Sequence, residues 1–523
     1  MRFSRRYLAT PLAMALLAGT TGALADTPQF GANPDLPEPQ RGLLPNMGVP
    51  EQAPWNDLKP TVPEGYTITE IASDLKIPRQ TLVLPNGDIL VAEGSGGHAP
   101  KLRPKDFVAG VIKAKGKTSV KGGNRLTLLR PTGDGSYEQT VFADGLDAPY
   151  GLALIDDHLY VANQGSLVRF DYEQGQTQAD GPPELVTPLP SEINHHWTKA
   201  MTASPDGEYL YVGIGSNSNI TERGMEAEVD RAEIWQINPE TGAHRAYATG
   251  VRNPTALTFQ PGTNTLWAVA NERDELGPNL VPDYLTSIQD GGFYGWPYSY
   301  WGQHVDPRVK PENPDKVESA IAPDYSLASH RAPLGVAFSN PQVGGEYSDG
   351  VFIGQHGSWN RADPVGYNVV FVPFENGKPA GDPVDFVSGF LTDDGHTRGR
   401  PVGVSVAPDG SVIVADDLTN AVWRVTRDDA DSTPPAPAAA SDDSAAMQQS
   451  EPATPGDSAA MPDEPSTTPD ESTTTPDDSA AMPEAPDDSA TTPDESSTLS
   501  DEGNEVPDDP SDDAQEEPAT TAT

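Results

Sequence analysis

The 523-residue chain contains no cysteine, which excludes a disulfide, a zinc–thiolate centre and a cysteine nucleophile. Basic residues are also scarce. There are 33 Lys and Arg against 78 Asp and Glu, and a formal net charge of −45 argues against a nucleic-acid-binding protein, which needs a basic face. Apolar residues make up only 36 %, which excludes a protein with many membrane spans. The 49 Gly and 54 Pro disfavour long helices, so we predict an all-β protein rich in turns.

The C-terminal segment, residues 428–523, differs sharply from the rest of the chain. It carries 27 Asp and Glu but no Lys, Arg, Phe, Tyr or Trp, which leaves a formal charge of −18 for the residues before it. This composition offers almost nothing that can pack into a core. We therefore expect a disordered, solvated acidic tail, with a specific binding tail as the alternative.

The N-terminus has the composition of an export signal. Three arginines among the first six residues precede an apolar run over residues 7–17, and a small-x-small pattern typical of a cleavage site ends at Ala25. The run is too short to span a bilayer, so the pattern predicts a cleaved signal peptide over residues 1–25 and a periplasmic or secreted protein. Residues 26–62 are rich in proline and lack periodicity, and we expect an arm that lies on the folded domain.

A hairpin pattern recurs six times between residues 63 and 427. Each copy joins a tight turn to a β-branched or alternating run. The copies span residues 85–94, 155–165, 204–216, 261–272, 348–358 and 407–417. A further apolar strand precedes each copy, beginning at Pro78, Ala148, His196, Arg252, Arg331 and Gly399. Repeated hairpins predict a six-bladed β-propeller over residues 63–427, closed by a strand at residues 66–71 that pairs into the last blade.

In a propeller, the start of each first strand and the end of each second strand meet at one mouth of the central channel. The first-strand starts carry Arg79, Tyr150, His196, Arg252, Asn253, Arg331, Arg398 and Arg400. The second-strand ends carry Glu93, Asn163, Asn217, Glu272, Asp274, Gln355, His356, Asp416 and Asp417. Several arginines converging on one mouth of an acidic domain predict a pocket for an anionic ligand. The neighbouring carboxylate and carbonyl oxygens suit Ca²⁺ better than zinc.

Four motifs within this region carry a family resemblance. They are GVRNPTALTFQPGTNTLWAVANERDELG at residues 250–277, DGGFYGWPY at 290–298, HGSWNR at 356–361 and RGRP at 398–401. Together they resemble the soluble pyrroloquinoline-quinone (PQQ) sugar dehydrogenases of the glucose/sorbosone dehydrogenase type. The resemblance implies a propeller that holds PQQ with Ca²⁺ over the channel mouth, oxidises a sugar by hydride transfer to PQQ and passes the electrons to an external acceptor.

The resemblance also implies a role for individual residues. His196 stands where the family has its catalytic base. Arg252 would be catalytic as well, by hydrogen-bonding the quinone, and Asn253 would hold a ring substituent. Arg398 and Arg400 match the pair that grips the PQQ carboxylates. The resemblance also implies cofactor contacts for Arg331 and Arg361, and either Arg361 or His356 would replace a lysine of the family. The implied Ca²⁺ loop consists of Glu272, Arg273 and Asp274, which would bind the ion largely through backbone carbonyls.

Each of these residues also has a structural interpretation. The Arg252–Asn253 pair can hold the turn before a strand, and the acids after residue 271 can form a solvated loop. Tyr294, Trp296 and Trp301 are candidates for a wall that contacts the sugar. The alternative is that they belong to the core of a blade, and we favour this alternative for Trp296. Two other functions remain open: a Ca²⁺-dependent propeller lactonase, disfavoured by the arginine-rich mouth, and a non-enzymatic propeller that has lost PQQ.

Overall fold

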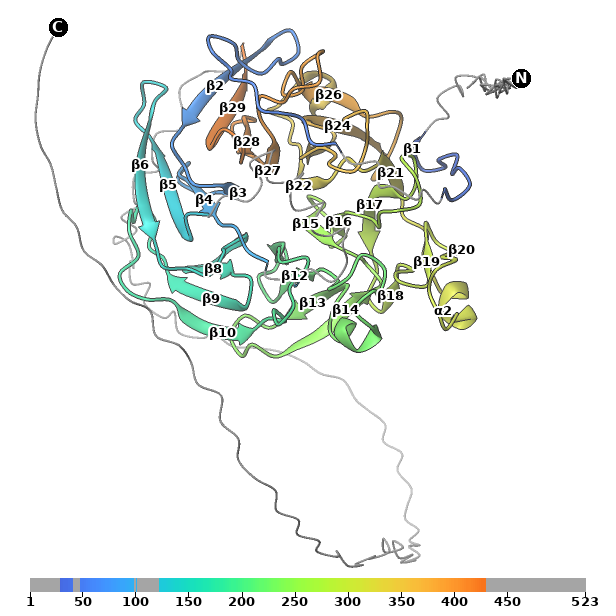
Figure 1. The fold of residues 1–523 in the computed structure, drawn as a ribbon. Coiled ribbons are helices and arrows are strands. Elements are labelled where there is room, and N and C mark those ends of the chain that lie inside the picture. The colour runs from blue at the N-terminus through green and yellow to red at the C-terminus, as the bar shows by residue number, and fades with distance from the viewer. Residues whose placement is uncertain (1–28, 41–47, 98–99, 101–121, 429–523) are drawn as a thin grey trace, which may run out of the picture. The chain divides into compact units, whose positions relative to one another are not determined.

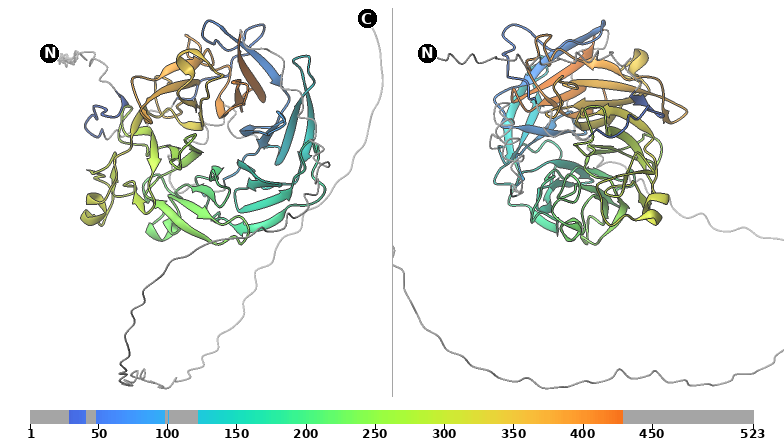
Figure 2. Two further views of the ribbon diagram at one scale, coloured as in Figure 1. Left: turned by 180° about the vertical axis from the view of Figure 1, so that it is seen from behind. Right: turned by 45° about the vertical axis from the view of Figure 1, so that its right-hand side comes forward.

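Residues 29–40, 48–97, 100 and 122–428 are described by a computed structural model. They form six small sheets arranged in a ring, antiparallel except for the short β14–β18 pair, which confirms the predicted six-bladed propeller (Figure 1). Figure 2 shows the same ring from behind and obliquely. The predicted signal peptide and residues 429–523 of the predicted tail lie outside the described residues. Among the described helices, none is long and apolar enough to cross a membrane.

The first two blades have four strands each. Blade 1 consists of β3 (Pro78–Val83), β4 (Ile89–Glu93), β5 (Arg125–Pro131) and β6 (Tyr137–Ala143). Blade 2 consists of β7 (Gly151–Ile155), β8 (His158–Ala162), β9 (Ser166–Asp171) and β10 (Glu184–Pro188). Both follow the chain from the channel outward, as the hairpin pattern predicts.

Blades 3 and 4 carry additional short strands. Blade 3 consists of β11 (Met201–Ala203), β12 (Leu210–Ile214), β13 (Glu233–Ile237), β14 (His244–Thr249) and β18 (Gly292–Phe293), with the 3₁₀ turn η1 (Met225–Glu228) between β12 and β13. Blade 4 consists of β15 (Pro254–Phe259), β16 (Leu266–Ala270), β17 (Pro282–Ile288), β21 (Tyr325–Ser329) and the arm strand β1 (Phe30–Gly31). Between β17 and β21 lie the paired strands β19 (Ser299–Tyr300) and β20 (His304–Val305) and the helix α2 (Pro314–Glu318).

The last two blades complete the ring. Blade 5 consists of β22 (Pro333–Phe338), β23 (Gly350–Gln355), β24 (Asn368–Glu375), β25 (Lys378–Pro379) and β26 (Val384–Val387), with η2 (Gly345–Tyr347) before β23. Blade 6 consists of β27 (Pro401–Val406), β28 (Val412–Asp416), β29 (Ala421–Arg427) and β2 (Tyr66–Ala72). The pairing of β2 with β29 joins the two ends of the propeller, as predicted for the strand at residues 66–71.

The hydrophobic core is divided among the blade interfaces. One buried cluster packs blade 1 on blade 2 through Leu126 and Leu159, and another packs blade 5 on blade 6 through Phe352 and Trp423. Corresponding clusters fill the other four interfaces. Since each sheet buries both faces against neighbours, the ring holds its loops rigidly at the channel ends.

The turns between first and second strands follow from their sequence. In blade 3, Asp206 Oδ1 accepts hydrogen bonds from Ser204 Oγ and from the backbone N–H of Glu208, at 2.5 and 3.1 Å, and Gly207 takes a φ of +73°. In blade 6, Asp409 Oδ1 accepts from the N–H of Ser411 at 2.9 Å in the same way. Aspartate followed by glycine therefore closes these hairpins locally.

Candidate functional site

Strand pairing places the predicted site residues at one end of the channel. The first residue of each inner strand pairs with a residue at or near the end of the second strand: Pro78 with Glu93, Pro254 with Ala270, Pro333 with Gln355 and Pro401 with Asp416. Residues before the first strands and after the second strands therefore share one mouth. Below it the channel is narrow, because the Tyr150 hydroxyl lies 3.1 and 3.2 Å from backbone carbonyls of blades 4 and 5.

His196 lies before β11 and is held through one ring nitrogen. Its Nδ1 lies 2.8 Å from the carbonyl oxygen of Ser216 and 3.0 Å from the hydroxyl oxygen of that residue. A carbonyl oxygen only accepts, so Nδ1 carries the proton and Nε2 is left as the acceptor. Burial, assisted by the charge of Arg252, lowers the pKa of His196 well below its usual value. The imidazole is therefore neutral near pH 7, with one nitrogen ready to take a proton.

Arg252, before β15, is held in place by four hydrogen bonds to the protein, which leave one N–H of Nη2 unused. Only 3 % of the residue is exposed, and its guanidinium donates to four oxygens. Two of these belong to Asn219, the carbonyl at 3.2 Å and Oδ1 at 3.0 Å; the others are the carbonyls of Asn271 and Glu272 at 3.0 and 2.9 Å. The backbone of Arg252 also accepts from the N–H of Ser216 at 2.8 Å, which connects it to the partner of His196.

Asn253 lies against His196 because a glycine separates them. A Cβ on Gly215 would come within 2.5 Å of Asn253 Oδ1 and 2.6 Å of the His196 Cβ, so this position accepts no side chain. Asn253 Oδ1 is buried and accepts no hydrogen bond from the described residues. His196, Arg252 and Asn253 thus form one contiguous group, which the sequence predicted without knowing the residues that join them.

Asn219 is the main residue of this group that the sequence interpretation missed. Besides binding Arg252, its Oδ1 accepts from the backbone N–H of Asp274 at 2.8 Å, and its Nδ2 donates to the Asp274 carbonyl at 3.3 Å. It lies in the loop after β12, two residues beyond Asn217, which the hairpin pattern did identify. Its role depends on contacts with a loop 55 residues away, which no local pattern reveals.

The loop after β16 carries the three predicted metal residues in different environments. Burial raises the pKa of Glu272 to about 7. The side chain of Arg273 is 1 % exposed and pairs with the equally buried Asp306 at 3.2 Å, so only its backbone carbonyl is available to a cation. Asp274 Oδ1 accepts from Asn360 Nδ2 and lies 3.5 Å from His330 Nδ1. The loop is therefore anchored on both sides.

Oxygen atoms suited to Ca²⁺ are present in this loop, although several already accept hydrogen bonds. The carbonyls of Asn271 and Glu272 accept from Arg252. Asn271 Oδ1 is buried and has no hydrogen-bond donor among the described residues. In the described part of the chain, no three His, Asp or Glu side chains gather closely enough to hold a metal. The loop thus fits an ion held by carbonyl and amide oxygens together with Glu272, and does not offer a cage of carboxylates.

Arg331 and Arg361 lie at the mouth of blade 5 but differ in their contacts. Arg361 donates to the Pro278 carbonyl and, at 3.0 Å, to Asn279 Oδ1, so its guanidinium is held by the blade 4 loop. Arg331 makes one long contact, 3.5 Å to Gln355 Oε1, and its buried Nε has no acceptor among the described residues. Burial, with the nearby charge of Arg361, lowers the pKa of Arg331 to about 10.

Arg398 and Arg400 precede β27 and also have few partners. Arg398 makes one long contact, 3.5 Å to the Gly389 carbonyl, and its buried Nε lacks an acceptor in the described region. Arg400 is 3 % exposed, and its guanidinium donates no hydrogen bond to the described residues. Buried guanidinium groups without acceptors are costly unless an anion engages them. The arrangement therefore fits a ligand that carries several carboxylates.

A second cluster of charged side chains lies between blades 5, 6 and 1. The sequence analysis did not predict that these side chains contact one another. Asp417 accepts from Arg79 at 2.6 Å and from His356 Nε2 at 3.0 and 3.1 Å. Burial alone would raise the pKa of Asp417, but the charges of His356, Arg79 and Arg400 outweigh it and lower that pKa to about 2. The sequence placed all four residues at the mouth but could not show that they touch.

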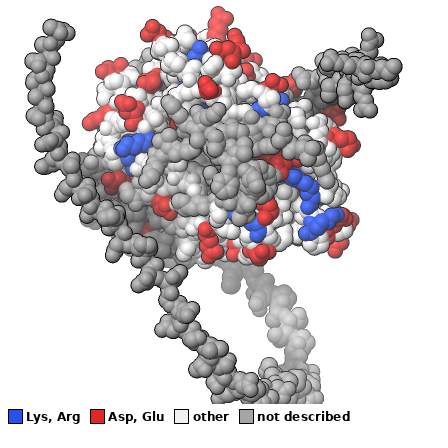
Figure 3. Space-filling model, viewed as in Figure 1, with Lys and Arg blue, Asp and Glu red and all other residues white. Residues whose placement is uncertain are grey.

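Two of the three aromatic candidates for a sugar-facing wall belong to the core, whereas Trp301 is partly buried and packs against the edge of two core clusters. Tyr294 and Trp296 are 1 % and 4 % exposed, which agrees with the blade-core alternative. Trp197, which the motifs did not single out, lies partly exposed beside His196, with the Arg79 guanidinium carbon 5.4 Å from its ring. On the face drawn in Figure 3, acidic side chains are frequent around the rim.

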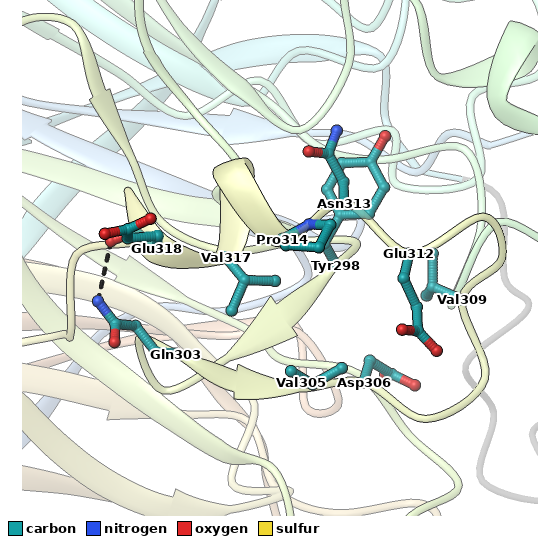
Figure 4. A pocket seen from close by; sticks show the side chains of 10 residues that line it. All are labelled: Tyr298, Gln303, Val305, Asp306, Val309, Glu312, Asn313, Pro314, Val317 and Glu318. Carbon is teal, nitrogen blue, oxygen red and sulfur yellow. Dashed lines mark hydrogen bonds between the residues drawn. The ribbon is translucent and has the colours of Figure 1, made fainter.

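A separate hollow lies in the segment between β19 and α2. It has a volume of about 260 Å³ and is lined by Tyr298, Val305, Asp306, Val309, Asn313 and Val317, among others (Figure 4). Asp306 forms part of its wall and pairs with Arg273 behind it. None of the predicted cofactor-binding residues lines this hollow, so it is distinct from the mouth.

Comparisons with known proteins agree with the geometry. A family model described as TrAA12-like matches residues 60–283 and 303–428. An uncharacterised protein of Borreliella burgdorferi is 33% identical over 303 residues, covering 57% of this chain and 76% of that protein. A protein of Coprinopsis cinerea named pyrroloquinoline quinone-dependent pyranose dehydrogenase is 22% identical over 366 residues. That match covers 61% of this chain but only 46% of the Coprinopsis protein.

Solved structures show the same fold. The holo PQQ domain of pyranose dehydrogenase from Coprinopsis cinerea gives a TM-score of 0.57 at 19% sequence identity, covering 71% of this chain and 97% of that domain. The calcium structure of a Trichoderma reesei enzyme of carbohydrate-active family AA12 also gives 0.57, at 18% identity, covering 70% and 97%. These findings confirm the relationship to the PQQ-dependent sugar dehydrogenases that the motifs indicated. Because the matched residues take in almost the whole propeller, the chain belongs to the TrAA12-like family.

Proposed function

We propose that this protein is a quinoprotein oxidoreductase that oxidises a sugar at the propeller mouth, with PQQ as cofactor and Ca²⁺ as its companion ion. The observation that carries the proposal is the pairing of two features at one mouth. A neutral histidine, His196, presents an unprotonated Nε2, while Arg331 and Arg398 each have a buried Nε without an acceptor among the described residues, and the Arg400 side chain donates no hydrogen bond to them. Relatives named aldose sugar dehydrogenase and pyrroloquinoline quinone-dependent pyranose dehydrogenase support the same interpretation.

The residues that would hold the cofactor follow from their free donors. Arg400, Arg398 and Arg331 would bind carboxylates, because guanidinium groups pair with carboxylates through parallel hydrogen bonds. Asn253 and Arg252 would face the quinone edge, next to His196. When bound, PQQ supplies a quinone that accepts a hydride.

The protein supplies the proton chemistry. His196 Nδ1–H donates to the Ser216 carbonyl, and this hydrogen bond fixes the tautomer and the orientation of the ring. Nε2 would take the proton from the sugar hydroxyl as general base, since a neutral imidazole is in the required state near pH 7. Arg252 contributes a fixed positive charge beside this group, which favours the negative charge that develops on the reacting oxygens.

Ca²⁺ would be held by Asn271 Oδ1, the Arg273 carbonyl and Glu272, with water molecules completing its shell. These oxygen atoms come from the loop that Arg252 and Asn219 anchor. When bound, a cation there acts as a Lewis acid and offsets the negative charge of the cofactor. Burial raises the pKa of Glu272 to about 7, and an ion at this loop would favour the ionised form of that carboxyl group.

Export and the electron acceptor belong to the same proposal. The N-terminal signal predicts a periplasmic or secreted enzyme, and an external acceptor would receive the electrons. The substrate is a sugar, an aldose or a sorbosone-like compound. The lactonase alternative is disfavoured by the arginines of the mouth and by the family match, and a propeller without PQQ is the outcome that the following experiment distinguishes.

The test is reconstitution of the purified protein with PQQ and Ca²⁺. PQQ binding is measured by titration, and dye reduction is then followed with a panel of aldoses. We expect saturable PQQ binding that is strengthened by Ca²⁺, and dye reduction with at least one sugar. Absence of PQQ binding would overturn the proposal. Binding of PQQ without reduction by any sugar would keep the cofactor and remove the sugar substrate.

A further inference from the structure

The N-terminal arm, here its described residues 29–40 and 48–62, contacts the loops that carry the predicted cofactor and metal residues. The backbone N–H of Gln40 donates to the Leu276 carbonyl at 2.8 Å, two residues beyond the predicted metal residues. The N–H of Gly48 donates to the Trp359 carbonyl at 3.2 Å, two residues before Arg361. The arm therefore ties blade 4 and blade 5 loops together by backbone hydrogen bonds.

The same arm continues to blade 6. The N–H of Ala53 donates to the Thr397 carbonyl at 2.8 Å, and the N–H of Thr397 donates back to the Glu51 carbonyl at 2.9 Å. Thr397 immediately precedes Arg398. At its beginning the arm adds β1 to the edge of β21 in blade 4, with Phe30 opposite Leu327. In Figure 1, β1 lies beside β21 at the edge of that blade.

Two aromatic rings of the arm lie against Arg331 and Arg398, the two arginines whose buried Nε lacks an acceptor among the described residues. The guanidinium carbon of Arg331 is 4.8 Å from the ring centre of Phe30. The guanidinium carbon of Arg398 is 5.8 Å from the ring of Trp55. Trp55 is itself fixed edge-on against Phe390 and Trp423, with ring centres 5.6 and 5.8 Å away. Each ring offers its π electrons to a cation while leaving the N–H groups of that cation unpaired.

We propose that the arm is a working part of the cofactor site, in which Phe30 and Trp55 are positioning residues that orient Arg331 and Arg398 toward the carboxylates of the anionic cofactor. The inference rests on the proposed function. Most of the arm lies before residue 60, where the family match begins. The proposed role of Phe30 and Trp55 therefore belongs to a part of the chain that the family model does not describe.

The physical reason is preorganisation. A free arginine side chain has many rotamers, and fixing it during binding costs conformational entropy. A ring packed on one face of the guanidinium restricts these rotamers before the ligand arrives, and a planar group held in this way presents its N–H donors edgewise. An aromatic ring serves better than a carboxylate would, because a carboxylate would itself accept the hydrogen bonds that the cofactor requires.

The experiment uses variants of the full chain that keep apolar bulk but remove the ring. Phe30→Leu and Trp55→Leu are expected to weaken PQQ binding about 3- to 30-fold, the range that cation–π contacts cover. Phe30→Tyr and Trp55→Phe, which keep a ring, are expected to retain most of the affinity. Tyr247→Leu is the matched control, because Tyr247 stacks under Arg245 at 5.2 Å on β14, outside the mouth.

A double-mutant cycle separates positioning from simple stabilisation. If Phe30 acts through Arg331, then Phe30→Leu weakens PQQ binding in the wild-type background but has little further effect when Arg331 is already Met. Melting temperatures of all variants identify any that are unfolded, and the Phe30 pair carries the test alone if Trp55→Leu does not fold.

The outcomes also distinguish the two proposals. If the wild-type protein does not bind PQQ, the proposed function fails. If it binds PQQ and folded Phe30→Leu binds equally well, or loses the same affinity with and without Arg331, the role of the arm is overturned.

Discussion

The two sides of the channel mouth treat their arginines differently. On the side of blades 3 and 4, Arg252 donates to four protein oxygens and is held in position without any ligand. On the side of blades 5 and 6, Arg331 and Arg398 each have a buried Nε without an acceptor, and Arg400 donates to none of the described residues. The first side is therefore organised by folding itself, whereas the second retains donors that are available to an added anion.

This difference matches the two roles proposed for the mouth, which are proton transfer on the side of blades 3 and 4 and cofactor binding on the side of blades 5 and 6. A base must be in one tautomer and one orientation before the substrate arrives, and the Ser216 contacts give His196 both. A carboxylate-binding surface instead gains affinity from donors that are unpaired in the free protein. Folding stability should thus depend on Arg252, and ligand affinity on Arg331, Arg398 and Arg400.

The largest effect is expected on the organised side. His196→Gln should lower kcat by about 10²- to 10⁴-fold, the usual contribution of a positioned base, while PQQ still binds. Steady-state kinetics with saturating PQQ, together with a PQQ titration, measure the two quantities separately. His195→Gln is the control, because that ring lies edge-on to His196 at 4.7 Å and is exposed. A large loss of kcat in the control, with none in His196→Gln, would show that the neighbouring histidine is the base.

Arg252→Met should be the variant of the mouth that costs most stability. It removes four hydrogen bonds and leaves the carbonyls of Asn271 and Glu272 without the donor that they have in the wild type, which should lower the free energy of unfolding by about 3 kcal/mol or more. Urea denaturation measures this as a lower midpoint with an unchanged slope. Arg245→Met, which breaks a half-exposed pair with Asp290, should change the midpoint little. Equal midpoints for the two variants would contradict the structural role of Arg252.

The fold and the location of the candidate site residues at one mouth could be predicted from the sequence, because the hairpin pattern repeats in every blade. Each blade begins with an apolar strand and a tight turn, which a local Asp-Gly pair closes in blades 3 and 6, and strand register then places the flanking residues at one end. Thus His196, Arg252 and Arg400 could be placed at the mouth from the hairpin pattern alone, without any tertiary information.

The partners of these residues could not be predicted, because they come from distant parts of the chain. Arg252 meets Asn219 across 33 residues, and Arg79 meets Asp417 across 338 residues, through closure of the ring. Likewise, nothing in the composition of the arm indicates that Phe30 contacts Arg331, 301 residues later in the numbering. Local patterns show where a side chain begins, but only packing shows whether its hydrogen bonds are already used.

Arg400→Ala tests the side of the mouth proposed to bind the cofactor, where we expect a loss of PQQ affinity. PQQ affinity should fall by about 1.5–3 kcal/mol, the range for hydrogen bonds to charged groups, with the sugar preference unchanged. The urea midpoint of the cofactor-free protein should fall much less than that of Arg252→Met, since the Arg400 side chain donates no hydrogen bond to the described residues and stabilises the fold only through its charge near Asp417. Titration of PQQ and denaturation of the same samples give both values. A midpoint as low as that of Arg252→Met would remove the distinction between the two sides.

The smallest effect, and the one that depends on pH, concerns Asp417. Its pKa is about 2 in the folded protein and 3.8 in the reference state, because His356 and Arg79 outweigh the effect of burial. A carboxyl whose folded pKa is lowered contributes stability above its unfolded pKa and loses it as the pH falls through the folded pKa. A shift of this size corresponds to about 2 kcal/mol. Asp417→Asn should therefore be less stable than the wild type at pH 6, and the difference should shrink between about pH 4 and pH 2. Urea midpoints at several pH values test this, with Asp290→Asn as an exposed control whose effect is small at every pH. A difference that persists unchanged at pH 2 would mean that the Asp417 charge does not stabilise this cluster.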